Sequence, residues 1–240
     1  MCRAAELTKN DTVVEVGPGL GTLTAKLAKY AGRVVAVEFD GQLADSLATR
    51  VQAPHLEVVA GDVLAFNPST LQTDYKVVAN VPYYITSKII RHFLEAAHPP
   101  EMIVLLVQKE VAERLAAGPG DMSLLAVSAQ FYAAVDLGPI VPASLFTPPP
   151  KVDSQIVRLR YHGPVFADVQ PEQFFRVVRA GFAERRKKLR SSLSGGLHLS
   201  KAQTDQLLAE AQMSQEARAQ ELTLEEWRSL TQQYFQSALH

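Results

Sequence analysis

The first half of the chain alternates between short apolar runs and segments with helical periodicity. The apolar runs are Thr12–Val16, Arg33–Phe39, Leu56–Ala60, Tyr75–Ala79 and Met102–Val107. The helical segments are Thr22–Tyr30, Gly41–Val51, Thr86–Ala97 and Lys109–Ala117. Parallel strands need a crossover connection, usually a helix. This alternation therefore predicts an α/β fold, a doubly wound parallel sheet with helices on both faces.

The pattern changes in the second half of the chain. Ser123–Tyr132 is compatible with a helix or a strand, and Val152–Tyr161 alternates like an antiparallel strand. Beyond Gly163-Pro164 the strand signal fades, and four amphipathic segments indicate short helices: Pro171–Phe182, Arg185–Leu193, Lys201–Gln212 and Leu224–Phe235. We therefore expect two domains, an α/β domain over residues 1–162 and a small helical domain over 163–240.

Composition excludes several classes of protein. The 240 residues carry a formal net charge of −1, so any basic surface must be local. Cys2 is the only cysteine, which excludes a disulfide framework and a zinc site built on paired cysteines. No ligand cluster for another metal is evident. No apolar run approaches the roughly 18 residues of a membrane span, and no signal peptide is evident. We expect a soluble cytoplasmic protein.

Glycines and carboxylates follow the first three predicted strands. Gly17, Gly19 and Gly21 lie between a strand and a helix, where they allow a sharp turn and close approach of a ligand to the backbone. Glu38 and Asp62 end the next two strands, where they suit ribose hydroxyls and an adenine amine. The alternative is a tight turn with exposed carboxylates.

Two ligands suit this edge of the sheet, a dinucleotide and S-adenosylmethionine. The glycine spacing is one residue shorter than the dinucleotide pattern, and no residue pattern suggests hydride chemistry. Glu15, directly before the glycines, fits an amine better than a pyrophosphate. These features favour S-adenosylmethionine.

The stretch Asn80-Val81-Pro82-Tyr83-Tyr84 follows the fourth strand. Pro82 fixes its own φ and pushes Val81 towards an extended conformation, so the backbone is stiff. An amide, carbonyl groups and an aromatic ring at this position suit a planar group that carries an amine, such as a nucleobase. The alternative is a strand-ending turn with a buried tyrosine.

Taken together, these motifs resemble those of S-adenosylmethionine-dependent rRNA adenine dimethyltransferases. The order and spacing agree for Glu15–Gly21, Glu38, Gly61-Asp62, Asn80–Tyr83 and the late motif Phe146–Ser154. The resemblance runs from about Glu6 to Trp227, and Tyr84–Ser87 with the triple proline look most like the small-subunit (16S) branch. It implies a Rossmann-like class I methyltransferase that dimethylates two adjacent adenines in a hairpin near the rRNA 3′ end.

The resemblance also implies roles for single residues. Asn80 and the Pro82 carbonyl would hold the amine of the target base, and Tyr83 and Phe146 would stack on that base. The cofactor would be bound by Glu15, Gly17, Gly19, Gly21, Glu38, Asp62, Val63 and Asn80. The alternative for Phe146 is a core aromatic beneath the proline loop.

A basic run lies in the predicted helical domain. It comprises Arg176, Arg179, Arg185, Arg186, Lys187, Lys188 and Arg190. Such charges bind phosphate largely without reading sequence, so we expect small-subunit rRNA or a pre-30S particle as the partner of a monomeric protein. A solvated helix face is the alternative. Lys88, Arg91, Lys109 and Arg114 could extend the basic track.

The chain departs from the family pattern at its start. Family members carry a Gln-Asn-Phe-Leu motif ahead of the first strand, and this sequence begins too late to contain it. We therefore expect weaker cofactor binding than in a full-length relative. The rival functions are a large-subunit rRNA dimethylase of the antibiotic-resistance type, a catalytically weak ribosome assembly factor and, more remotely, a nicotinamide-dependent dehydrogenase.

Overall fold

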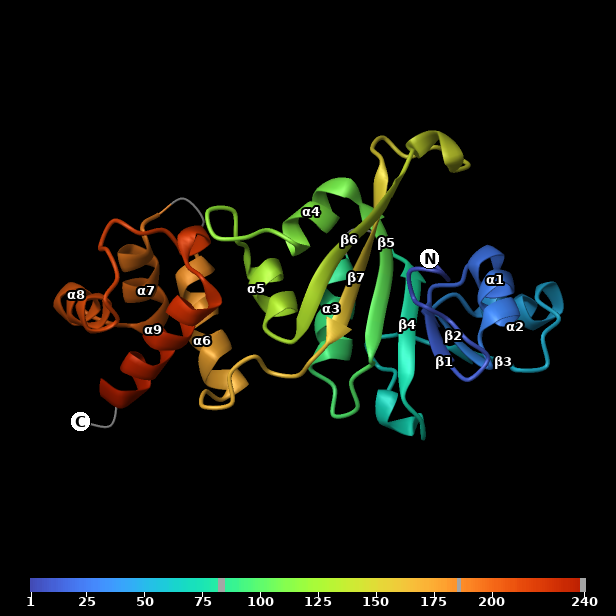
Figure 1. Cartoon of the computed structure of the whole chain (residues 1–240), viewed down its shortest axis with the longest axis horizontal. Coiled ribbons are helices and arrows are strands. Elements are labelled where there is room, and N and C mark those ends of the chain that lie inside the picture. Colours follow the sequence, from blue (N-terminus) through green and yellow to red (C-terminus); the bar gives the residue numbers. More distant parts are fainter. Residues whose placement is uncertain (82–84, 185–186, 238–240) are drawn as a thin grey trace. The chain divides into compact units, whose positions relative to one another are not determined.

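The protein forms two compact units in a computed structural model, which describes residues 1–81, 85–184 and 187–237 (Figure 1). The first unit comprises Met1–Glu113 and Ala133–His162, and the second comprises Arg114–Tyr132 and Gly163–His240. The segment Arg114–Tyr132, which the sequence analysis placed in the first domain, thus groups with the C-terminal helices. Its Phe131 ring stacks on Phe174 at a centroid distance of 4.5 Å, which explains this grouping.

A seven-stranded sheet is the core of the first unit, in the order β3-β2-β1-β4-β5-β7-β6. All neighbouring pairs from β3 to β5 are parallel, whereas β7 is antiparallel to both of its neighbours. The strands are β1 (Thr12–Val16), β2 (Arg33–Glu38), β3 (Leu56–Ala60), β4 (Tyr75–Asn80), β5 (Met102–Gln108), β6 (Ala133–Val141) and β7 (Ser154–Tyr161). The predicted doubly wound α/β fold is confirmed.

Crossover helices connect the parallel strands. They are α1 (Thr22–Tyr30), α2 (Gly41–Arg50) and α3 (Thr86–Leu94), with the short 3₁₀ turn η1 (Pro68–Thr70) between β3 and β4. The helix α4 (Lys109–Leu115) follows β5, and the 3₁₀ turn η3 (Ala143–Leu145) joins the antiparallel strands β6 and β7. Right-handed crossovers place α1 and α2 on one face of the sheet and α3 on the other, because the chain reverses direction across the sheet after β3. The Asp40 carboxylate caps α2 by accepting hydrogen bonds from the backbone N–H groups of Gln42 and Leu43, at 2.8 and 3.1 Å.

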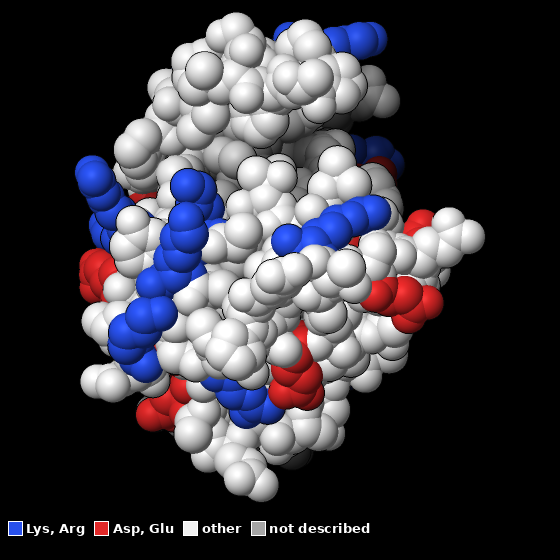
Figure 2. All heavy atoms as spheres, turned by 90° about the vertical axis from the view of Figure 1, so that its right-hand side faces the viewer, with Lys and Arg blue, Asp and Glu red and all other residues white. Residues whose placement is uncertain are grey.

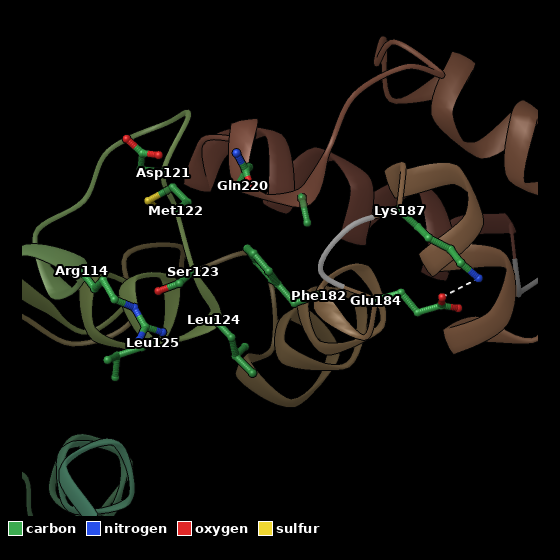
Figure 3. Close-up of a pocket in the computed structure, with 11 residues that line it drawn as sticks. Arg114, Asp121, Met122, Ser123, Leu124, Leu125, Phe182, Glu184, Lys187 and Gln220 are labelled. Carbon is green, nitrogen blue, oxygen red and sulfur yellow. Dashed lines mark ion pairs between the residues drawn. The ribbon is translucent and has the colours of Figure 1, made fainter. Parts of the chain in front are cut away.

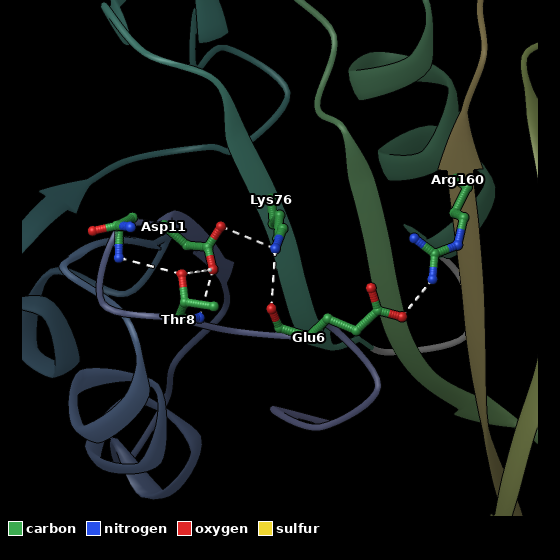
Figure 4. Close-up of polar contacts among 6 residues, drawn as sticks. Glu6, Thr8, Asp11, Lys76 and Arg160 are labelled. Atoms are coloured by element: carbon green, nitrogen blue, oxygen red, sulfur yellow. Dashed lines mark hydrogen bonds and ion pairs between the residues drawn. The ribbon is translucent and has the colours of Figure 1, made fainter.

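Lys76 ties the N-terminal segment to the middle of the sheet (Figure 4). Its side chain, on β4, is only 11% exposed and pairs with the Asp11 carboxylate at 2.9 Å. The same ammonium donates a hydrogen bond to the Glu6 carbonyl at 3.2 Å. The Glu6 carboxylate pairs in turn with Arg160 on β7, at 2.5 Å. These contacts anchor the N-terminal segment to two strands, β4 and β7.

The second unit is helical. Its elements are α5 (Leu124–Gln130), α6 (Pro171–Phe182), α7 (Leu189–Leu197), α8 (Lys201–Glu210), η4 (Ala219–Glu221) and α9 (Leu224–Ser237). The predicted helix Arg185–Leu193 is wrong in position, since α7 begins at Leu189 and continues to Leu197. The two glycines near its end do not stop it, because Gly196 packs against Ala180 so closely that a Cβ would lie 2.7 Å from that residue.

Trp227 is the centre of the helical unit. Its ring is fully buried, and a Cβ on Gly181 would lie 2.3 Å from it, so α6 and α9 approach at a distance that only glycine permits. Within the described residues, no helix is both long and apolar enough to span a bilayer.

The Lys76 pair yields a stability prediction. Replacing Lys76 by Met leaves the Asp11 carboxylate partly buried without its cation, which we expect to lower the free energy of unfolding by about 2–4 kcal/mol. Urea unfolding followed by circular dichroism measures this loss. The control is Arg33→Met, which removes an exposed pair with Glu57 and should cost less than about 1 kcal/mol. Equal losses in the two variants would contradict the anchoring role of Lys76.

Candidate functional site

The carboxyl ends of the parallel strands form one rim of the first unit. β1, β2, β3 and β4 end there at Val16, Glu38, Ala60 and Asn80. The first residue of β7, Ser154, pairs with Gln108 at the end of β5, so the loop that carries Phe146 returns to the same rim. Residues from widely separated parts of the sequence are thus gathered along one edge, at the position where open α/β sheets bind ligands.

The glycine turn after β1 adopts a backbone that other residues rarely reach. Gly17, Gly19 and Gly21 have φ angles of 63°, 55° and 86°. A Cβ on Gly21 would lie 2.8 Å from the Leu47 and Val51 side chains, so this glycine lets the turn pack on α2. A Cβ on Gly17 or Gly19 would meet nothing within 4 Å. The first two glycines therefore leave open space in front of the backbone.

Glu38 joins the glycine turn to the end of β2. One carboxylate oxygen accepts a hydrogen bond from the backbone N–H of Gly19 at 2.9 Å, and the other accepts from that of Asp40 at 3.0 Å. The side chain is buried. A carboxylate can accept about four hydrogen bonds, so Glu38 retains acceptor capacity for a ligand hydroxyl while it orders the turn.

A cavity of about 350 Å³ opens at this rim. Four of the residues predicted to bind a cofactor line it: Gly17, Glu38, Asp62 and Val63. The Asp62 carboxylate also accepts a hydrogen bond from the Leu64 N–H at 2.9 Å, which fixes the turn after β3. Gly19, Gly21, Glu15 and Asn80 are not among the lining residues.

Sequence reasoning missed the apolar wall of this cavity. Val37, Phe39, Val81, Ile85 and Ile89 line it, and the Phe39 side chain is 78% exposed. An exposed phenylalanine directly after the strand-ending Glu38 was the available signal. Burying such a ring against a planar ligand is favourable.

Glu15 lies behind the glycine turn, in the middle of the sheet. It is 1% exposed, and its Oε2 has no hydrogen-bond partner among the described residues. Burial, reinforced by the charge of Glu38, raises the pKa of Glu15 to about 7. The neighbouring Thr24 hydroxyl opposes this rise only in part. A cation close to Glu15 would favour its charged form and supply the missing partner.

The two predicted catalytic residues in the described chain lie at the rim but differ in burial. Asn80, the last residue of β4, is exposed. Phe146 is half-buried and packs against the hydrophobic core of the unit. Asp153 holds its loop by accepting hydrogen bonds from the N–H groups of Ala143 and Lys109. The other two predicted catalytic residues, Pro82 and Tyr83, lie outside the described residues.

Three cations of the basic run pair with carboxylates of the helical unit. Lys187 pairs with Glu184, Lys188 with Glu216, and Arg190 with Asp205. Arg176 stacks over the Tyr234 and Phe235 rings. Arg179 makes no ion pair with any residue that the structure describes, and Arg185 and Arg186 lie outside the described part. The run therefore presents fewer free cations than its composition indicates.

On the face of the first unit that carries α1, α2 and β3, positive and negative side chains of the described residues are mixed (Figure 2). Figure 2 shows Lys and Arg interspersed with Asp and Glu on that face, below a hollow in its upper part. Over residues 1–81, 85–184 and 187–237, no group of three or more His, Cys, Asp and Glu side chains is arranged to hold a metal ion.

The buried Glu15 yields a prediction with a defined sign. Because its folded-state pKa is raised, the unfolded chain releases this proton at a lower pH, so Glu15 destabilises the fold increasingly between pH 4.5 and about 7. Glu15→Gln should match the wild type near pH 4.5 and exceed it by about 2–3 kcal/mol at pH 8 in urea unfolding. The exposed Asp45→Asn is the control. A stability difference that does not change with pH would contradict the assignment.

Comparison with known proteins identifies the family. The protein-family model described as ribosomal RNA adenine dimethylase matches residues 1–235 of this chain. Ribosomal RNA small subunit methyltransferase A of Dehalococcoides mccartyi is 44% identical over 232 residues, 95% of this chain and 80% of that protein. The protein of the same name from Clostridioides difficile strain 630 is 39% identical over 237 residues, 95% of this chain and 82% of that protein.

Solved structures agree with this result. The crystal structure of the 23S rRNA methyltransferase ErmE has a TM-score of 0.72 and 31% identity, over 97% of this chain and 94% of that chain. A dimethyladenosine transferase from Plasmodium falciparum shares the fold, with a TM-score of 0.77 and 24% identity over 99% of this chain and 94% of that chain. The family predicted from the motifs is confirmed: the chain belongs to the ribosomal RNA adenine dimethylase family.

Proposed function

We propose that this chain transfers methyl groups from S-adenosylmethionine to the exocyclic amines of two adjacent adenosines in the 3′-terminal hairpin of small-subunit rRNA. It would act as a monomer in the cytoplasm, during ribosome biogenesis. One observation carries the proposal: in a chain of this family, residues suited to a methyl donor share a single rim with Asn80, which is suited to a target base.

The choice of the small subunit rests on the relatives. Those named small subunit methyltransferase A are 44% and 39% identical to this chain, whereas the 23S rRNA methyltransferase ErmE is 31% identical. A large-subunit rRNA dimethylase is the second candidate, because ErmE matches nearly the whole fold. The substrate would be the rRNA itself or a pre-30S particle that contains it.

The rim suits S-adenosylmethionine in three respects. The space in front of Gly17 and Gly19 would let a ligand reach the backbone, and the adjoining cavity has a volume of about 350 Å³. Glu38 would accept hydrogen bonds from the ribose hydroxyls, with Asp62 and Val63 at the adenine. Glu15, whose Oε2 has no hydrogen-bond partner among the described residues, would provide a negative charge for the amino group of the ligand. When bound, S-adenosylmethionine supplies an electrophilic methyl group on a sulfonium centre.

Methyl transfer then depends on how the chain holds the amine of the adenine. The lone pair of this amine is delocalised into the ring, so the amine is a weak nucleophile. The Asn80 side-chain oxygen and the Pro82 carbonyl would accept its two protons and favour the pyramidal geometry needed for in-line attack, an interaction that strengthens in the transition state. Tyr83 and Phe146 would stack on the flipped base and offset the cost of unstacking it.

The hold on RNA would come from cations of the helical unit. Arg185, Arg186 and Arg179 would contact phosphates directly. Lys187, Lys188 and Arg190 would first exchange their carboxylate partners for phosphate, so their contribution should be small and strongly dependent on salt.

Methylation of purified subunits tests the function. Unmethylated small subunits and large-subunit rRNA are incubated with labelled S-adenosylmethionine, and nucleosides are identified by mass spectrometry. We expect dimethyladenosine in the 3′-terminal fragment of small-subunit rRNA. Label in large-subunit rRNA alone would favour the second candidate. Binding to small subunits without any methylation would favour an assembly factor.

Asn80→Ala tests the mechanism. Removing an acceptor that acts mainly in the transition state should lower the single-turnover methylation rate about 10²-fold. The Kd of the cofactor, measured by calorimetry, should change only a few-fold. The exposed Asn10→Ala serves as the matched control and should leave both values unchanged. An Asn80→Ala variant with the wild-type rate would refute this role.

A further inference from the structure

The helical unit contains a cavity of its own, of about 420 Å³ (Figure 3). Its walls come from the end of α4, the loop before α5, the segment after α6 and η4. The polar and aromatic residues that line it include Arg114, Asp121, Phe182, Glu184, Lys187 and Gln220. All of them belong to the same compact unit. The cavity is therefore separate from the rim of the sheet, and the proposed chemistry does not use it.

Backbone hydrogen bonds fix one wall of this cavity. The N–H groups of Gly120 and Met122 donate to the Gln220 carbonyl at 2.9 and 3.1 Å. The Gln220 side-chain amide donates back to the Gly120 carbonyl at 2.8 Å. Three hydrogen bonds thus fasten the loop before α5 to η4, although the two segments lie about a hundred residues apart.

The ring of Phe182, which packs on Trp227, forms another wall of the cavity. Phe182 lines the cavity, and its ring lies 5.5 Å from that of Trp227 with an interplanar angle of 32°. Trp227 is fully buried and wedged against Gly181. Phe182 is therefore a preorganised platform for a planar group, because little of its freedom is lost on binding.

Of the described charged side chains that line the cavity, two pair with each other and two make no ion pair. Lys187 and Glu184 neutralise each other at 2.6 Å. The Arg114 guanidinium is half-buried, and neither it nor the Asp121 carboxylate makes a hydrogen bond or ion pair with a described side chain. Among its described lining residues, the cavity thus offers one unpaired cation, one unpaired anion and one aromatic face. This combination suits a ligand with an anionic group, a planar ring and an amine.

We propose that this cavity binds a single unstacked ribonucleotide of the RNA substrate, at a distance along the RNA from the adenosines that are methylated. Arg114 binds its phosphate, Phe182 stacks on its base, and Asp121 accepts a hydrogen bond from the base amine. The inference rests on the proposed function for its substrate class. It gives the helical unit a defined contact with RNA that does not depend on the cations already held in ion pairs.

Three substitutions test the site in the full chain: Arg114→Gln, Asp121→Asn and Phe182→Leu. Binding of small-subunit rRNA without cofactor is measured by fluorescence anisotropy, and methylation by the assay above. We expect each variant to raise the Kd for RNA and the KM for small subunits about tenfold, with kcat and the Kd of S-adenosylmethionine unchanged. Arg114→Gln should also reduce the salt dependence of binding by about one phosphate contact.

The matched control is Lys201→Gln, which removes an exposed cation from the same unit without touching the cavity. It should raise the Kd less than twofold. An equal loss in Arg114→Gln and Lys201→Gln would overturn the proposal, because it would mean general electrostatic attraction. Binding of free AMP, weakened by Arg114→Gln while RNA binding is unchanged, would also overturn it. Thermal unfolding identifies a misfolded Phe182→Leu variant, and the other two variants then decide.

Failure of the proposed function is separately visible. A wild-type chain that methylates no rRNA refutes the proposed function. In that case, loss of RNA binding in Arg114→Gln, but not in Lys201→Gln, would still support the nucleotide site.

Discussion

Hydrogen bonding of β1 to β2 on one side and to β4 on the other is the constraint on which the site depends. These pairings bring the ends of three strands that are far apart in the sequence to one edge. β1 is also where successive connections change direction, so the glycine turn that follows it opens into a crevice. A shift of one residue in either register would turn Glu15 and its neighbours to the opposite face of the sheet.

A buried carboxylate in the middle of this sheet opposes folding. Among the described residues, one carboxylate oxygen of Glu15 has no hydrogen-bond partner, and burial raises the pKa of Glu15 to about 7. Under the proposed function, a cationic group of the ligand would supply the interaction that the fold lacks. Stability would in this way be exchanged for ligand binding at this position.

Charge is managed differently in the helical unit. Among the described residues of the basic run, Lys187, Lys188 and Arg190 pair with carboxylates of their own unit, and Arg176 lies over an aromatic ring. Such pairs at the surface contribute little stability, but they lower the positive potential that the unit presents to phosphate. Arg114 and Arg179, which make no ion pair with any described residue, are therefore more informative about the proposed RNA binding than the length of the basic run.

The sequence by itself determined the α/β class, the glycine turn, and the placing of Glu38, Asp62 and Asn80 at strand ends, because apolar periodicity and turn chemistry are local. Only the tertiary structure decided what depends on contacts between distant segments. Arg114–Tyr132 belongs to the helical unit because Phe131 packs on Phe174. The helix α7 continues past its glycines to Leu197, and most of the described residues of the basic run are in ion pairs. The apolar wall that includes Phe39 and the second cavity beside Phe182 also depend on packing between residues that are distant in the chain. Such packing leaves no local pattern in the sequence.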